Sequence, residues 1–178
     1  MNNPRGPGAV EAAIKTAFRG VVLGKGVSLR QAQAIDDYDR DRPISPAEFA
    51  AQRRGEIIDD WSLVPLGELE WACIPYLDAE GFRYYIPALM LSVLRHYDKS
   101  SMRVIGTVSA LYPKKDDSWD FHMSKYALLT PAQKSAIAAF LAALPDLVEL
   151  QGEDRKTVPR ALRNYWHEFL KDHDVLDP

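Results

Sequence analysis

Acidic side chains occur at the spacing of a calcium-binding loop between residues 37 and 48. The carboxylates that match positions 1, 3, 5 and 12 of the twelve-residue EF-hand loop are Asp37, Asp39, Asp41 and Glu48. Ile44 supplies the aliphatic side chain of position 8, and Ser45 supplies the hydroxyl of position 9. Because Ca²⁺ prefers several oxygen ligands from one tight loop, this segment is the sharpest candidate for a metal site.

Two features of the sequence count against calcium. Position 6 holds Arg42, where the loop needs a glycine for its sharp turn. The second acidic segment, 116–120, cannot complete a pair of loops, because Ala127 stands where its twelfth-position acid belongs. Glu48 has a simpler role as a capping-box partner of Ser45 at the start of a helix. We therefore expect a solvated acidic turn, although a homodimer would pair two copies of the loop.

Cysteine and histidine are present without the partners that catalysis needs. Cys73 lies in an apolar stretch with no nearby cation, which is typical of a small buried hydrophobe rather than a nucleophilic thiolate. His122 follows Asp120 by two residues, and such a pair can exchange protons, but a surface or structural role is commoner. The metal-binding spacing His-x-x-x-His does not occur among the four histidines, which are His96, His122, His167 and His173.

The sequence also lacks recognisable nucleotide and hydrolase motifs. The glycine-rich segment 20–26 has no Gly-Lys-Ser/Thr order, so it predicts a flexible connection rather than a phosphate-binding loop. No set of nucleophile, base and oxyanion donors can be assembled from the remaining residues. We therefore lean towards a protein that is not an enzyme, and we expect no cofactor.

Two surfaces remain as alternatives for binding. A tyrosine-rich segment containing Tyr84 and Tyr85, with His96 further along, would suit a pocket for a small molecule or a substrate, although such side chains more often belong to a core. Basic side chains near the end of the chain fall within about 80° of one another on a helix, and they are Lys156, Arg160, Arg163, His167 and Lys171. Such a stripe would bind an anion or an acidic partner, or it would be the solvated face of an amphipathic helix.

Helix signals account for most of the chain. Three capping boxes begin at Ser28, Ser45 and Thr130, and each has Glu or Gln three residues later. Apolar side chains recur at helical spacing in between, which predicts an all-α domain of seven or eight short helices. We expect a central helix over 79–97 broken at Pro87, a helix ended by Pro145, and a loop over 113–123. The segment 102–111 suits a helix or a strand, and we favour the helix.

Length and composition predict one domain and a cytoplasmic location. We expect a flexible N-terminus over 1–8, a helical domain over 9–171 and a tail over 172–178 of the 178 residues. The net charge of −3 makes nucleic acid an improbable partner. The longest apolar run, 84–94, is too short to span a membrane, and the N-terminus has no signal-peptide pattern. One cysteine suits a reducing compartment.

Three stretches of the sequence resemble a known family. They are 59–61 (Asp-Asp-Trp), 77–89 (Leu-Asp-Ala-Glu-Gly-Phe-Arg-Tyr-Tyr-Ile-Pro-Ala-Leu) and 161–166 (Ala-Leu-Arg-Asn-Tyr-Trp). Together they resemble a bacterial family described only as a domain of unknown function, over about residues 14–170. The resemblance implies a small bacterial cytoplasmic protein and assigns no catalytic residue. By analogy with small bacterial proteins, we expect an accessory protein, immunity- or regulator-like, whose partner is another protein.

Overall fold

The computed structural model describes residues 6–38 and 43–170, and this part of the chain is entirely helical. It contains nine α-helices, eight of them at least seven residues long, with three short 3-10 helices and no strand. The α-helices are α1 (Pro7–Ala17), α2 (Leu29–Asp37), α3 (Pro46–Gln52), α4 (Leu66–Glu70), α5 (Ala79–Arg95), α6 (Met102–Ala110), α7 (Trp119–Tyr126), α8 (Pro131–Leu147) and α9 (Asp154–Asn164). The 3-10 helices are η1 (Trp61–Leu63), η2 (Ile74–Tyr76) and η3 (Trp166–Phe169). The predicted all-α class is confirmed.

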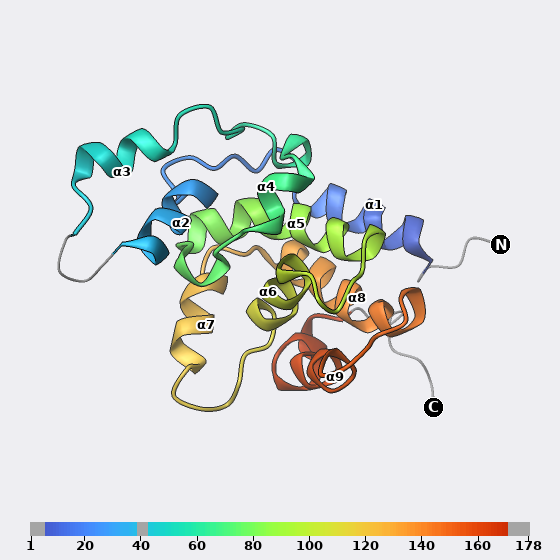
Figure 1. The fold of residues 1–178 in the computed structure, drawn as a ribbon. Helices are drawn as coiled ribbons and strands as arrows, with labels where there is room; N and C mark the ends of the chain where they lie inside the picture. Colours follow the sequence, from blue (N-terminus) through green and yellow to red (C-terminus); the bar gives the residue numbers. More distant parts are fainter. Residues whose placement is uncertain (1–5, 39–42, 171–178) are drawn as a thin grey trace.

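Helix α5 forms the centre of the fold, and α1, α6, α7 and α8 pack around it (Figure 1). It begins where the Asp78 carboxylate accepts a hydrogen bond from the Gly81 amide at 2.8 Å, which satisfies one of the amides that a helix start leaves free. Every residue from 84 to 93 is buried. A helix that is apolar on all sides needs neighbours on all sides, which is why α5 holds the other elements together.

The expected break of the central helix at Pro87 was wrong. Helix α5 continues through this residue, although proline removes one backbone hydrogen bond and crowds the preceding turn at a cost of about 3 kcal/mol. The segments on both sides of Pro87 are buried in the same core, so their packing outweighs this local cost. The expected stop at Pro145 fails in a similar way, because α8 continues to Leu147.

Two other boundaries differ from the prediction, and one is confirmed. The ambiguous segment 102–111 forms the helix α6, as favoured. The expected loop over 113–123 was too long, because α7 already begins at Trp119. Helix α7 buries only Tyr126, so its sequence has no apolar periodicity by which it could be recognised. The three predicted capping boxes are all present.

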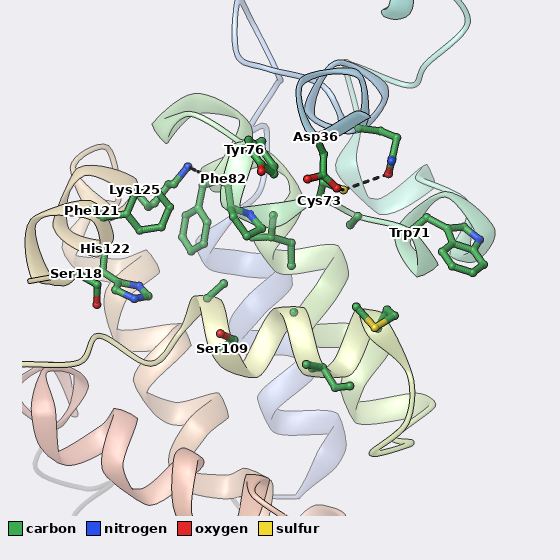
Figure 2. Close-up of a pocket in the computed structure, with 18 residues that line it drawn as sticks. Asp36, Trp71, Cys73, Tyr76, Phe82, Ser109, Ser118, Phe121, His122 and Lys125 are labelled. Atoms are coloured by element: carbon green, nitrogen blue, oxygen red, sulfur yellow. Dashed lines mark hydrogen bonds between the residues drawn. The ribbon is translucent and has the colours of Figure 1, made fainter. Parts of the chain in front are cut away.

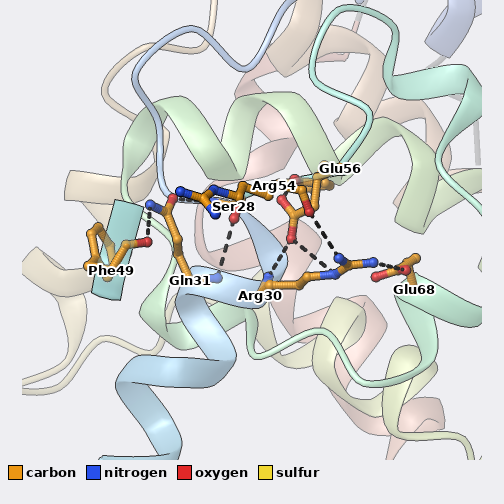
Figure 3. Close-up of polar contacts among 8 residues, drawn as sticks. Ser28, Arg30, Gln31, Phe49, Arg54, Glu56 and Glu68 are labelled. Atoms are coloured by element: carbon orange, nitrogen blue, oxygen red, sulfur yellow. Dashed lines mark hydrogen bonds and ion pairs between the residues drawn. The ribbon is translucent and has the colours of Figure 1, made fainter. Parts of the chain in front are cut away.

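Helix α3 projects away from the rest of the domain and packs against α2 (Figure 1). None of its residues is fully buried, so polar contacts hold this part of the chain (Figure 3). The side-chain amide of Gln31 donates to the carbonyl of Phe49 at 3.0 Å. The Arg30 guanidinium donates to the Arg54 carbonyl at 3.2 Å and forms an ion pair with Glu68 at 2.8 Å.

Candidate functional site: an apolar groove

The described part of the chain contains a groove of about 740 Å³. Helix α6 contributes one side of it, and the segment from Trp71 to Tyr76, which includes η2, contributes the other (Figure 2). Gln33 and Asp36 of α2 line one part, and side chains of α7 line another. Phe82 of α5 also lines it, so segments from five regions of the chain meet at this surface.

Close packing of η2 on α6 shapes the bottom of the groove. A Cβ atom at Gly106 of α6 would lie 3.3 Å from Cδ1 of the buried Ile74, so the absence of a side chain lets η2 approach. On the α7 side, the ammonium group of Lys125 donates to the carbonyls of Pro75 and Leu77. Burial lowers the pKa of Lys125, and these carbonyls are the partners that compensate its desolvation.

Large apolar side chains are exposed around the groove. Nine such side chains are exposed in the described residues, and five of them line this groove: Trp71, Tyr76, Met102, Ile105 and Phe121. Trp71 is 73% exposed and Met102 is 58% exposed. Single exposed apolar residues are normal on a protein surface, but their concentration at one concave place makes this groove the candidate binding surface.

Cys73 lies in the groove with its thiol directed at α2. The sulfur donates to Oε1 of Gln33 at 3.1 Å and lies 3.4 Å from Oδ2 of Asp36 (Figure 2). Burial, followed by the charges of Asp36 and Asp37, raises the pKa of this thiol to about 11. The thiol is therefore protonated near neutral pH, as expected for a cysteine that is not a nucleophile.

His122 lines the groove on α7. Burial lowers its pKa, against the opposing effects of a hydrogen bond to the Ala110 backbone and of the Asp116 carboxylate. The acidic side chain that acts on the imidazole is thus Asp116, whereas Asp120, considered from the sequence, is exposed. The ring is mainly neutral at pH 7 and can exchange hydrogen bonds with a ligand.

The structure does not bring together the residues of the alternative pocket. The Tyr84 hydroxyl donates to the Ile57 carbonyl at 2.9 Å, and that of Tyr85 donates to the Glu56 carboxylate at 3.4 Å. Tyr85 lines a cavity of about 100 Å³, and His96 lines a different one of about 140 Å³. Both tyrosines are core residues with paired hydroxyl groups, and the large groove lies elsewhere.

The basic stripe is not a continuous helical face. Helix α9 ends at Asn164, so Lys156, Arg160 and Arg163 lie on it, and His167 lies on η3. Lys171 lies outside the described residues. Beyond the end of the helix, the Trp166 side chain is buried and its indole N–H donates to the Leu111 carbonyl at 2.8 Å. The stripe was predicted on the assumption of one helix over 156–171, which was wrong.

The acidic segment is only partly described, because Asp39 and Asp41 lie outside the described residues. Glu48 accepts a hydrogen bond from the Ser45 amide at 3.0 Å, which confirms the predicted capping box. The Asp37 carboxylate accepts from the Gln33 side chain at 2.7 Å. Among residues 6–38 and 43–170, no three His, Cys, Asp or Glu side chains are grouped to hold a metal ion.

The glycine-rich segment 20–26, expected to be a flexible connection, is docked on the start of α5. The Lys25 amide donates to the Glu80 carboxylate and the Val27 amide to the Asp78 carboxylate, both at 3.0 Å. A Cβ atom at Gly26 would lie 2.6 Å from the Gly81 amide nitrogen. The loop therefore binds the protein's own carboxylates at amides that a phosphate loop would direct at its ligand.

The sequence stretches that carried the family resemblance have structural roles. The Trp61 indole donates to the Phe18 carbonyl at 2.8 Å, and the Asn164 side chain donates to the Pro113 carbonyl at 2.9 Å. Asp78, as described, caps α5 and receives the Val27 amide. These residues join distant parts of the chain, so they position the groove without lining it.

The fold and the groove define a class: a helical domain with an open apolar groove. Within this class the chain belongs to the family of unknown function DUF6714, whose model matches residues 8–170 and confirms the resemblance. Neither a curated protein nor a solved structure matches the chain. The helices of the described part are all too short or too polar to cross a bilayer.

Proposed function

We propose that the chain is a bacterial cytoplasmic interaction protein whose groove binds an apolar segment of another protein. The observation that carries this proposal is the gathering of Trp71, Met102 and Phe121, all exposed, around one 740 Å³ hollow. Tryptophan, the other aromatic residues and methionine are enriched in protein interfaces. Tryptophan is prominent among the residues that contribute most of the binding affinity.

The exposure of the lining favours a protein segment over a small molecule. Small-ligand sites cover most of their ligand, commonly 70–90% of its surface, and their walls are correspondingly enclosed. Trp71 is 73% exposed, so a small molecule in the groove would leave most of the indole in water. A protein segment lying along the surface would cover the indole and the neighbouring Met102 together.

The polar groups of the groove favour binding over catalysis. Cys73 is protonated near neutral pH, because burial and two carboxylates raise its pKa. Lys125 is held by two backbone carbonyls, so it is not available as a base. The Ser118 hydroxyl, which lines the groove near His122, donates to the Asp116 carboxylate at 2.6 Å, so it is not paired with the imidazole as a nucleophile with its base would be.

A second candidate function is the binding of an apolar small molecule. The volume of about 740 Å³ favours it, because drug-sized ligands occupy pockets of roughly 300–1,000 Å³. Native mass spectrometry of the purified chain distinguishes the two functions. A bound small molecule that is lost on Ile105→Asp, at the groove, would support this second candidate.

The proposal is tested by photo-crosslinking in cells that express the chain. A photoreactive phenylalanine analogue replaces Met102 in the groove or, as the control, Arg160 on the basic surface of α9. We expect a defined protein adduct from position 102 that is absent at position 160. Adducts at position 160 alone would move the interaction to the basic surface, and no protein adduct at either position would contradict the proposal.

A further inference from the structure

The backbone around the groove constrains what can lie in it. Its walls are helices and turns, and the described residues contain no strand whose edge an extended segment could join. The carbonyls of Pro75 and Leu77, which η2 directs to this region, already accept from the Lys125 ammonium. A segment that enters an apolar groove must satisfy its own N–H and C=O groups, and an α-helix does so internally.

The electrostatics of the groove are unequal along its length. Asp36 and Asp37 lie in the last turn of α2, where the helix dipole is negative and which contains no basic side chain. Neither carboxylate forms an ion pair with a lysine or arginine of the described residues. Asp36 lines the groove itself, where its Oδ2 lies 3.4 Å from the Cys73 sulfur.

The end of the groove at α7 is different. The basic side chain at that end is Lys125, and its ammonium group donates to the carbonyl oxygens of Pro75 and Leu77. Figure 2 shows Lys125, Phe121 and His122 towards one end of the groove and Trp71 towards the other, with Asp36 and Cys73 between them. A bound segment would therefore meet excess negative charge at Asp36, on the Trp71 side of Lys125, and apolar side chains, with Ile105 among them, along its length.

We propose that the occupant is an amphipathic α-helix of a partner protein, with its apolar face on Trp71 and Ile105 and a lysine or arginine beside Asp36. This inference rests on the proposed function and specifies the partner's secondary structure, charge and orientation. Helices that bind grooves carry apolar anchors at positions i, i+3, i+4 and i+7. The basic residue fixes which end of the helix lies against α2, because the reversed orientation would leave Asp36 beside apolar or acidic groups.

A peptide-display selection on the full-length chain tests the inference. Random 16-residue peptides are selected for binding, and each binder is then measured on two variants. Ile105→Asp places a charge in the groove, whereas Leu63→Asp places the same charge at an exposed apolar residue outside it, so it is the matched control. We expect peptides that bind Ile105→Asp at least tenfold more weakly than the wild-type chain and bind Leu63→Asp with unchanged affinity.

Three properties of those groove binders decide the inference. Their apolar residues should recur with helical spacing, circular dichroism should show helix formation on binding, and a lysine or arginine should occur near one end. Asp36→Asn should weaken the binding of such a peptide about fivefold. The affinity of the same peptide with glutamine at the basic position should not change on Asp36→Asn. Groove binders that are extended, or whose basic residue shows no coupling to Asp36, would overturn the inference.

The same selection separates this inference from the proposed function. If no binder depends on Ile105, the groove is not a protein-binding surface and both fail. If binders depend on Ile105 but lack the helical pattern or the coupling, the proposed function stands and the inference fails. Asp36→Lys combined with glutamate at the peptide's basic position should restore binding, which a loss of folding in the variant could not do.

Discussion

The Nζ atom of Lys125 lies 2.8 Å from the carbonyl oxygen of Pro75 and ties α7 to the turn on the opposite wall of the groove. The same ammonium group donates to the carbonyl of Leu77. These contacts cross almost fifty residues of sequence, and they hold Phe121, whose ring lies 4.8 Å from Nζ, next to η2. The Lys125 side chain therefore helps to hold α7 against η2.

Replacing Lys125 by methionine should destabilise the fold. The substitution keeps the apolar length of the side chain but removes the donor from two carbonyls, which costs about 1–3 kcal/mol. Urea unfolding measures the loss, with Lys99→Met as the control because Lys99 is exposed. Equal stability of the two variants would show that the Lys125 contacts do not hold the walls together.

Alanine at Gly81 or Gly26 should be strongly destabilising. A Cβ atom at Gly81 would lie 2.4 Å from the Val27 carbonyl oxygen, so the loop 20–27 would have to move from α5. We expect a loss of about 3 kcal/mol or more in the free energy of unfolding. Gly67→Ala in α4 is the matched control, because no atom lies within 4 Å of its added Cβ and alanine favours helices. A small effect at both Gly81 and Gly26 would contradict the docked loop.

Stability should fall on mild acidification because of His122. Its pKa is lower in the folded chain than the ordinary 6.5, so the unfolded chain binds the proton more tightly. The free energy of unfolding should therefore decrease as the pH falls below about 6.5, and the loss should be complete below the folded pKa. His122→Gln should remove this part of the pH dependence. An unchanged difference between wild type and variant from pH 7.5 to 5 would show that the imidazole is not destabilised by burial.

Calcium should not stabilise the chain. Glu48 is engaged as the capping partner of Ser45, and position 6 of the acidic segment is Arg42. A site with a dissociation constant of about 10 μM would add about 2.7 kcal/mol at 1 mM calcium. That would raise Tm by several degrees, at roughly 2–4 °C per kcal/mol for this size. Such a rise, abolished by Glu48→Gln, would show that the carboxylates bind calcium.

Much of the fold could be predicted from the sequence because its signals are local. Ser28, Ser45 and Thr130 each begin a helix through contacts within three residues. The expected break at Pro87 was wrong because packing of the whole core stabilises the helix around this residue, and no local sequence pattern shows that packing. Helix α9 was extended too far because the burial of Trp166 depends on Leu111, which lies 55 residues away.

The groove could not be predicted, because its residues meet only in the folded chain. Asp36 precedes the acidic segment 37–48, Trp71 lies in the apolar stretch around Cys73, and Phe121 lies in the expected loop over 113–123. None of these three residues stood out in the sequence. The tyrosines that suggested a pocket are core residues in the structure. One signal was available: Phe121 is a large apolar residue in a segment without apolar helical periodicity. Such residues have no buried face assigned to them and are candidates for an exposed patch.

The dissociation constant of the protein captured through position 102 tests the central claim most directly. That partner is purified, and its affinity for the wild-type chain is compared by calorimetry with its affinity for Ile105→Asp and Leu63→Asp. We predict at least tenfold weaker binding for Ile105→Asp, because a carboxylate would be buried against the apolar segment, and unchanged binding for Leu63→Asp. Equal affinities of all three chains would contradict the assignment of the groove as the binding surface.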